Sequence, residues 1–279
     1  MEAMAVHGGR IRPRVVLAKV LASGLCLGTG GSAGREGPIV QIGSSAGSSL
    51  GQWLKLDTYE IRVLVACGAT AGITATFNTP IAGVLFGIEL ILLEFRTRSF
   101  VPLVISSVFA TIISRTFLGS QPTFPVPAYD FRNPTELVLY LALGFVAALI
   151  GILMIKTLYG TEDLFDRLKI HPVLKPVLGG LLLGALGLGF PQVFGVGYET
   201  IGGILNQHLG TVGWQLLGFL LVLATVKIIA LSLTLGSGGS GGVFAPSLFV
   251  GAALGGTFGV LVNLAFPAIT APYPAYALV

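Results

Sequence analysis

Gly28–Pro38 reads GTGGSAGREGP, and Gly236–Pro246 reads GSGGSGGVFAP. The two stretches are offset by 208 positions, and six of their eleven residues are identical. Each follows an apolar stretch and leads into a second apolar stretch that opens with proline. The same offset relates further pairs: Lys19 and Lys227, Gly43 and Gly251, Gly47 and Gly255, and Gly51 and Gly259. One unit is therefore used twice, which in a hydrophobic chain predicts a transporter or channel with its site at the repeat interface.

The composition favours an integral membrane protein. Of the 279 residues, 53% are hydrophobic and 10% are charged, and the mean hydropathy is +0.88. A soluble domain carries about 25% charged residues. The net charge of +4 is modest, and the basic residues lie in short polar gaps, which argues against a nucleic-acid partner. We expect a multi-pass protein whose partner is the lipid bilayer, placed in the cell (plasma) membrane.

The apolar segments predict an all-α fold of broken, tilted helices. Several segments are shorter than the roughly 20 residues that a spanning helix needs, as in sites built from broken helices. The proline-rich stretch 120–134 is a connector between an N-terminal repeat, 1–119, and a C-terminal repeat, 135–279. Glycines spaced four apart line one helix face and allow another backbone to approach. The expected helices are Val15–Leu27, Pro38–Leu54, Ile61–Thr76, Pro80–Phe95, Val101–Leu118, Glu136–Leu158, Val173–Phe190, Gly197–Gln207, Trp214–Leu235 and Phe244–Phe266.

The repeated loop has the chemistry of an anion site. A helix that starts inside a membrane exposes N–H groups and partial positive charge, and glycines before it let an ion approach the backbone. Two such helix starts suit a small anion that is held weakly enough to leave again. The copies differ where the first has Glu36 and the second has Phe244. A carboxylate is costly in an apolar setting, so we expect Glu36 to occupy the anion's place until protonation or displacement frees it. Capping, or pairing with Arg35 at a solvated loop, is the alternative.

Three motifs resemble one known family. GREGP at Gly34–Pro38, FNTPIAGVLFGIE at Phe77–Glu89 and GGVFAP at Gly241–Pro246 are similar, in order and separation, to motifs of the CLC chloride channels and chloride/proton antiporters. The resemblance implies a CLC-type fold of two inverted repeats, a homodimer, and a separate pore in each subunit. It implies transmembrane chloride transport, by a voltage-gated-type channel with a glutamate gate or, alternatively, by a chloride/proton antiporter.

The resemblance also assigns roles to single residues. Glu36 matches the family's gating glutamate, and Phe244 matches an aromatic residue that lines the pore. Ser32 and Ser240 are further candidates for the pore lining, although a role in tight turns is the alternative. The backbone N–H groups expected to bind the anion are those of Arg35, Glu36, Gly37, Gly242, Val243 and Phe244.

Four more charged residues are candidates for transport roles. Glu89 is the candidate proton relay, although the family's relay position aligns with its neighbour Leu90, which favours a channel or another proton route. Glu94 is a second relay candidate, and a solvent-facing place near a helix end is the alternative for both glutamates. Lys19 and Lys227 are candidate pore-mouth cations that would raise the local anion concentration. Snorkelling to the membrane interface is the alternative for both lysines.

The sequence departs from the family at both ends. The family's GSGIP motif and its ion-contacting tyrosine have no match here, so we expect a fragment that lacks the first and the C-terminal helices. A truncated, non-conducting product is therefore an alternative, and we expect no cytoplasmic regulatory domain. A membrane enzyme is a weaker alternative, since neither loop has the Lys-Ser/Thr ending of a phosphate loop. We expect no catalytic residue, metal or cofactor, with chloride, alone or with protons, as the transported species.

Overall fold

The structure is a computed structural model that describes residues 2–121, 124, 126, 127, 129, 133, 134, 136–209, 213–267 and 270–279. The described residues form helices and no strands, which confirms the all-α prediction. The chain divides into two compact units. Unit 1 contains Met1–Leu25 and Arg35–Thr123, and unit 2 contains Cys26–Gly34 and Phe124–Val279. The first glycine-rich loop thus belongs to unit 2, and the later boundary falls inside the predicted connector, part of which lies outside the described residues.

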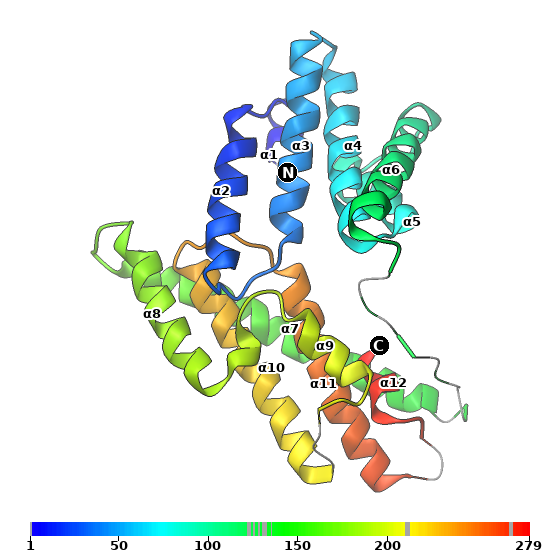
Figure 1. Ribbon diagram of the computed structural model, residues 1–279, viewed down its shortest axis with the longest axis vertical. Coiled ribbons are helices and arrows are strands. Elements are labelled where there is room, and N and C mark those ends of the chain that lie inside the picture. The colour runs from blue at the N-terminus through cyan, green and yellow to red at the C-terminus, as the bar shows by residue number, and fades with distance from the viewer. Residues whose placement is uncertain are drawn as a thin grey trace. The chain divides into compact units, whose positions relative to one another are not determined.

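Unit 1 is a layer of helices built around α4. Figure 1 shows α3 and α4 side by side, and α4 also packs against α6. The helix α5 continues directly into a π-helical turn, η1, where the sequence predicted one regular helix from Pro80 to Phe95. The elements are α1 (Glu2–Ala5), α2 (Arg14–Gly28, whose last turn belongs to unit 2), α3 (Glu36–Trp53), α4 (Thr58–Phe77), α5 (Pro80–Phe86), η1 (Gly87–Leu92) and α6 (Thr97–Leu118).

The contact between α3 and α4 depends on the glycines spaced four apart. A Cβ on Gly43 would overlap the carbonyl oxygen of Gly68, and a Cβ on Gly47 would overlap that of Leu64. The two backbones therefore touch directly, as the glycine spacing predicted.

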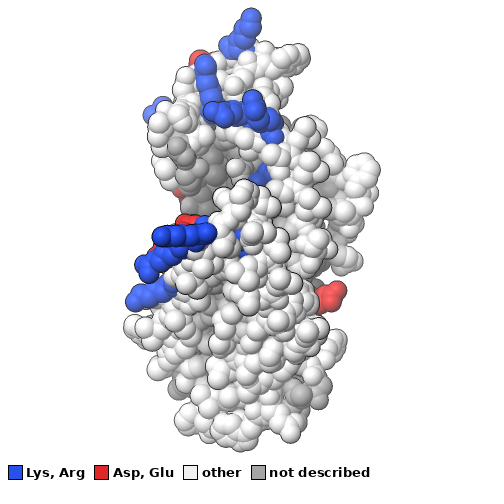
Figure 2. All heavy atoms as spheres, turned by 90° about the vertical axis from the view of Figure 1, so that its left-hand side faces the viewer, with Lys and Arg blue, Asp and Glu red and all other residues white. Residues whose placement is uncertain are grey.

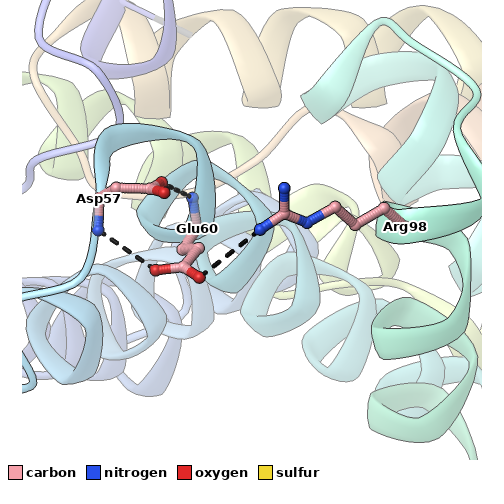
Figure 3. Close-up of polar contacts among 3 residues, drawn as sticks. All are labelled: Asp57, Glu60 and Arg98. Atoms are coloured by element: carbon pink, nitrogen blue, oxygen red, sulfur yellow. Dashed lines mark hydrogen bonds and ion pairs between the residues drawn. The ribbon is translucent and has the colours of Figure 1, made fainter.

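The start of α4 is fixed by a capping box (Figure 3). The Asp57 carboxylate accepts a hydrogen bond from Glu60 N at 2.8 Å, and the Glu60 carboxylate accepts one from Asp57 N at 3.3 Å. The other Glu60 oxygen lies 3.8 Å from Arg98 Nη2, near the start of α6. The cap contributes about 1 kcal/mol. The exposed ion pair contributes less than about 1 kcal/mol.

Unit 2 is centred on α10, which packs against α7, α8 and α11. Its core contains Leu220, Leu223 and Leu231 of α10 together with Phe249 and Ala253 of α11. The elements are α7 (Glu136–Arg167), α8 (Leu174–Gly189), the 3₁₀ turn η2 (Pro191–Val193), α9 (Tyr198–Leu205), α10 (Gly213–Gly236), α11 (Phe244–Ala265) and α12 (Tyr273–Ala277).

The helix α7 is longer than the sequence predicted. The expected end was Leu158, where the apolar pattern stops, but the helix continues to Arg167. Phe165 is buried within this extension, so packing of its ring supports the added turns although charged residues surround it.

The surface of both units is largely apolar. Within the described residues, five helices are long and apolar enough to cross a membrane, namely α4, α6, α7, α10 and α11. On the face drawn in Figure 2, most of the surface carries no charged side chain, and the Lys and Arg residues gather in limited groups. A soluble protein rarely exposes so large an apolar area. The chain is therefore an integral, multi-pass membrane protein.

Candidate anion-binding site

The two glycine-rich loops pair with each other inside unit 2. Gly34 N donates to the carbonyl oxygen of Gly242, and Gly242 N donates to that of Gly34, each at 2.7 Å. These bonds form an antiparallel bridge between two residues that the 208-residue offset relates. An antiparallel pair of equivalent residues is related by a local twofold rotation, since each residue meets its own counterpart. The loops are thus inverted with respect to each other.

The same backbone conformation forms both loops. Gly31 N donates to the Cys26 carbonyl at 2.8 Å, and Gly239 N donates to the Thr234 carbonyl at 2.9 Å. These donor and acceptor pairs obey the 208-residue offset. Both loops also contain a glycine with positive φ, +98° at position 30 and +101° at position 238. Side chains rarely adopt this conformation, so glycine is required there.

Each loop leads into a helix with the same kind of start. The N-cap residues Arg35 and Val243 have similar backbone angles, with φ of −84° and −92°. The third helical residue is proline in both copies, and it has no N–H to donate. The helical ladder begins at the fourth helical residue, as in other α-helices, with Ile39 N bonded to the Arg35 carbonyl (3.0 Å) and Ser247 N to the Val243 carbonyl (2.9 Å), so the proline costs no bond of the ladder.

The helix starts have the geometry of anion sites. In α3 the N–H groups of Glu36 and Gly37 precede the first bond of the ladder, and in α11 those of Phe244 and Ala245 do. The helix dipole adds partial positive charge at the same place. Each start therefore contains oriented N–H groups of the kind that bind anions, although their use by chloride stays a prediction.

The two helix starts differ in their first side chain. Glu36 is almost fully buried, with 2% of its surface exposed, whereas Phe244 is 51% exposed. A carboxylate in the first turn of a helix interacts favourably with the dipole, by up to about 2 kcal/mol when it is partly buried. The Glu36 carboxylate thus lies where the dipole of α3 favours negative charge, which is the condition for it to compete with an anion.

The serine hydroxyl groups of the paired loops are buried. Ser32 is fully buried, and its N–H donates to Thr234 Oγ1 at 3.0 Å. The hydroxyl oxygens of Ser32 and Ser240 are both buried, and among the described residues neither has a hydrogen-bond partner. A buried hydroxyl without a partner costs free energy, so a small hydrogen-bonding ligand would be favoured beside either of them.

The remaining candidate residues lie elsewhere. Lys227 is fully buried in α10, and Lys19 is half-buried in α2. Glu89 is exposed in the π-helical turn η1, next to the exposed Leu90. Glu94 pairs with Arg96 at 3.2 Å. The relay role of Glu89 and the pore-mouth roles of the lysines stay predictions.

One segment beside these loops was not predicted from the sequence. The turn 193–197, between η2 and α9, contacts both Lys227 and the first glycine-rich loop. The sequence marks this turn only weakly, because its two glycines stand among apolar residues that show no periodic pattern. Both glycines, Gly195 and Gly197, have positive φ.

Comparison with known proteins gives consistent matches. A ClcB-like protein of Ralstonia nicotianae is 39% identical over the whole chain, and the chain covers 65% of its length. The H(+)/Cl(−) exchange transporter ClcA of Vibrio cholerae is 33% identical over 91% of the chain, which covers 54% of that protein. The chain thus spans roughly half to two thirds of the length of these bacterial relatives.

Solved structures agree with these matches. The crystal structure of a slow cyanobacterial Cl−/H+ antiporter is similar with a TM-score of 0.78 and 28% identity, over 92% of this chain and 60% of that one. A CLC-type fluoride/proton antiporter, at 24% identity over 96% of this chain and 65% of that one, has the same fold with a TM-score of 0.75. The family model described as voltage gated chloride channel matches residues 1–279. Together with the paired, inverted glycine loops, this match over every residue shows that the chain belongs to the CLC family.

Proposed function

We propose that this chain carries chloride across a membrane, with N–H groups at the start of α3 and at the start of α11 each able to bind the anion and with Glu36 as the gate. The observation that carries the proposal is the pair of inverted glycine loops, each of which leads into a helix start with oriented N–H groups. Only one of the two copies adds a buried carboxylate at its helix start.

The Glu36 carboxylate and chloride compete for the same electrostatic environment. When Glu36 is ionised, its negative charge satisfies the dipole of α3 and disfavours an anion there. Protonation removes that charge, and the N–H groups of the first turn then favour chloride instead. Phe244 presents an aromatic side chain at the matching place of α11, which shapes the path and adds no charge. Binding at helix N–H groups alone is weak enough for an ion to leave, as conduction requires.

Channel activity and proton-coupled antiport are both compatible with this site. Channel activity is our first proposal, because Leu90 stands where the family's proton relay aligns, and leucine cannot hold a proton. Antiport is the second, because the Vibrio relative and the cyanobacterial structure are named as exchangers of chloride and protons. Assembly as a homodimer and placement in the cell membrane are part of the same proposal and rest on the family resemblance.

The test is chloride flux from liposomes that contain the purified protein, with and without a pH gradient. A channel moves chloride without protons, whereas an antiporter couples the two movements. In the Glu36→Gln variant, chloride flux should no longer depend on pH, whereas in the parent a single titrating group changes it by up to about tenfold per pH unit. Glu60→Gln, an exposed glutamate of the capping box, is the matched control and should behave as the parent does. Absence of chloride flux in the parent protein, or unchanged pH dependence in Glu36→Gln, would contradict the proposal.

A further inference from the structure

Lys227 is a buried cation in the middle of an apolar helix. Its side chain is fully buried in unit 2. The ammonium group donates to the carbonyl oxygens of Val193 at 3.0 Å and Gly195 at 2.9 Å. It also lies 5.0 Å from the ring centroid of Phe249, on α11. The cation is therefore held by two carbonyl dipoles and the face of one aromatic ring.

These contacts show which groups compensate for burying the Lys227 ammonium group. Burying an ammonium group is unfavourable unless polar groups compensate for the lost water. Among the described residues, no carboxylate lies within ion-pair distance of Lys227. The compensation comes from backbone carbonyls and from the ring, through a cation–π contact. The ammonium group thus binds a backbone turn instead of neutralising an acid.

The turn 193–197 depends on contacts outside itself. Gly195 and Gly197 have φ of +61° and +87°, a conformation with little local preference to keep it in place. A Cβ on Gly197 would lie 2.5 Å from the Phe249 ring and 3.5 Å from the Lys227 nitrogen, so the backbone packs directly on both. The carbonyls of Val193 and Gly195 point at the ammonium group. Loss of the ammonium group would leave both carbonyls without this partner and free the turn to move.

The same turn supports the first glycine-rich loop. Gly195 N donates to the Gly30 carbonyl at 3.4 Å. The neighbouring Phe194 ring lies against Gly30, 3.3 Å from the place of a Cβ there. On its other side the ring fills the space that a side chain at Gly187 of α8 would need. The ring of Phe194 is therefore wedged between α8 and a loop that lies more than 160 positions earlier in the sequence.

We infer that Lys227 is a positioning residue: by holding the turn 193–197, it fixes the first glycine-rich loop and so sets the selectivity of the anion path. The effect on anions rests on the proposed function, whereas the effect on the loop does not. The role differs from that of a pore-mouth cation, because the charge acts on the backbone and not on the ion.

The experiment measures amide hydrogen exchange in the parent protein and in Lys227→Met, reconstituted in lipid. Exchange at residues 28–34 and 193–197 should become about tenfold faster in Lys227→Met, while α6 is unchanged. Lys227→Arg keeps the charge and the donors, so its exchange should stay close to that of the parent. Lys156→Met is the matched control, because Lys156 is an exposed lysine of α7 in the same unit, and it should leave both segments unchanged.

A second variant keeps the test decisive if Lys227→Met does not fold. Phe194→Leu removes the wedge but leaves the ammonium group and its bonds in place, so exchange should rise at 28–34 and stay unchanged in α10. In the flux assay, the chloride-to-nitrate preference of Lys227→Met should fall at least about threefold, a change that a loss of stability alone would not produce.

The two proposals fail in different ways. Unchanged exchange at residues 28–34 in both Lys227→Met and Phe194→Leu would overturn the positioning role, whatever happens to the flux. A parent protein that moves no chloride would overturn the proposed function, and the exchange data would still decide whether Lys227 positions the loop.

Discussion

The two copies of the glycine-rich unit share their backbone and differ in their side chains. Both loops have the same turn, the same positive φ glycine and the same proline in the helix that follows. The side chains diverge at Glu36 against Phe244, and the matched lysines differ in burial, since Lys19 is half-buried and Lys227 is fully buried. Glycine and proline thus specify the backbone that the two loops share, and the side chain at the first helical position distinguishes the copies.

Each of the two helices α3 and α11 has glycines spaced four apart, which we call the first and the second glycine stripe. They are Gly43, Gly47 and Gly51 in α3, and Gly251, Gly255 and Gly259 in α11. In the first copy, Gly43 and Gly47 receive the backbone of α4. In the second copy, Gly255 and Gly259 receive the backbone of the segment at α12, while Gly251, the counterpart of Gly43, faces open space. The same spacing therefore serves two different partners, and one of its positions has no packing role in the second copy.

The largest difference in the free energy of unfolding should come from replacing Gly43 and its counterpart Gly251 by alanine. Gly43→Ala would force the new Cβ into the Gly68 carbonyl, so α3 and α4 must separate, and we expect a loss of about 3 kcal/mol. Gly251→Ala meets no atom and gains helix propensity, so it should be neutral or stabilising by up to about 1 kcal/mol. The unfolding free energy of both variants in mixed micelles is the measurement. Equal losses would mean that the stripes are packed alike.

A smaller difference is expected at the positive φ glycines. Alanine at either position costs about 1 kcal/mol for the left-handed conformation. Gly30→Ala also presses on the Phe194 ring, 3.3 Å from the new Cβ, whereas the nearest atom to Gly238 is Pro176 Cγ at 3.7 Å. We expect a total loss of about 2 kcal/mol for Gly30→Ala, because it adds this crowding to the conformational cost, and about 1 kcal/mol for Gly238→Ala. The same micelle titration would contradict this ranking if Gly238→Ala were the more damaging change.

A hydrogen bond to the backbone of the first loop has no counterpart in the second loop among the described residues. Thr234 Oγ1 accepts from Ser32 N at 3.0 Å, while its repeat partner Cys26 makes no such bond to Ser240 in the described part of the chain. Thr234→Val should cost about 1.5 kcal/mol, because the buried Ser32 N–H loses its partner. Cys26→Ala should cost only about 0.5 kcal/mol. Similar losses for the two variants, measured as unfolding free energies, would show that the hydrogen bond adds little.

Much of this comparison could be predicted from the sequence, because glycine and proline act through local backbone geometry. The repeat placed the loops, and Phe244 was predicted as the first residue of α11. The start of α3 was predicted two residues late, at Pro38, since proline at the third helical position also allows a helix to begin before it.

The rest depends on contacts between distant segments, which a pattern does not encode. The place of Lys227 follows from the turn 193–197, and that turn has no periodicity that would mark it. The π-helical turn at Glu89 could not be predicted either, because its residues form the same apolar pattern as an ordinary α-helix. The contact between Phe194 and Gly30 requires that α8 and the first loop lie side by side, which only the tertiary structure gives.

The smallest difference is expected from the ionisation of Tyr276, a residue that packs on one of the glycines of α11 and has no ionisable counterpart at the glycines of α3. Burial, together with the charges of Glu136 and Tyr140, raises the pKa of Tyr276 to about 12, from an ordinary value near 10. The carbonyl of Tyr276 is the atom that packs on Gly255, whereas the α4 residues against the first stripe, Gly68 and Leu64, do not ionise.

The folded protein favours the neutral form of the Tyr276 phenol, and this determines how the free energy of unfolding changes with pH. Because the folded pKa lies above the unfolded one, the stabilisation is complete below pH 10 and is lost as the pH rises from about 10 to about 12. Tyr276→Phe cannot ionise, so its unfolding free energy should fall less between pH 9 and pH 11 than that of the parent. At pH 7 the variant should be no less stable than the parent, because the buried Tyr276 hydroxyl has no hydrogen-bond partner among the described residues. The micelle titration, repeated at these three pH values, measures the difference. An identical alkaline loss in the parent and in Tyr276→Phe would place the pH-sensitive contact somewhere other than the second stripe.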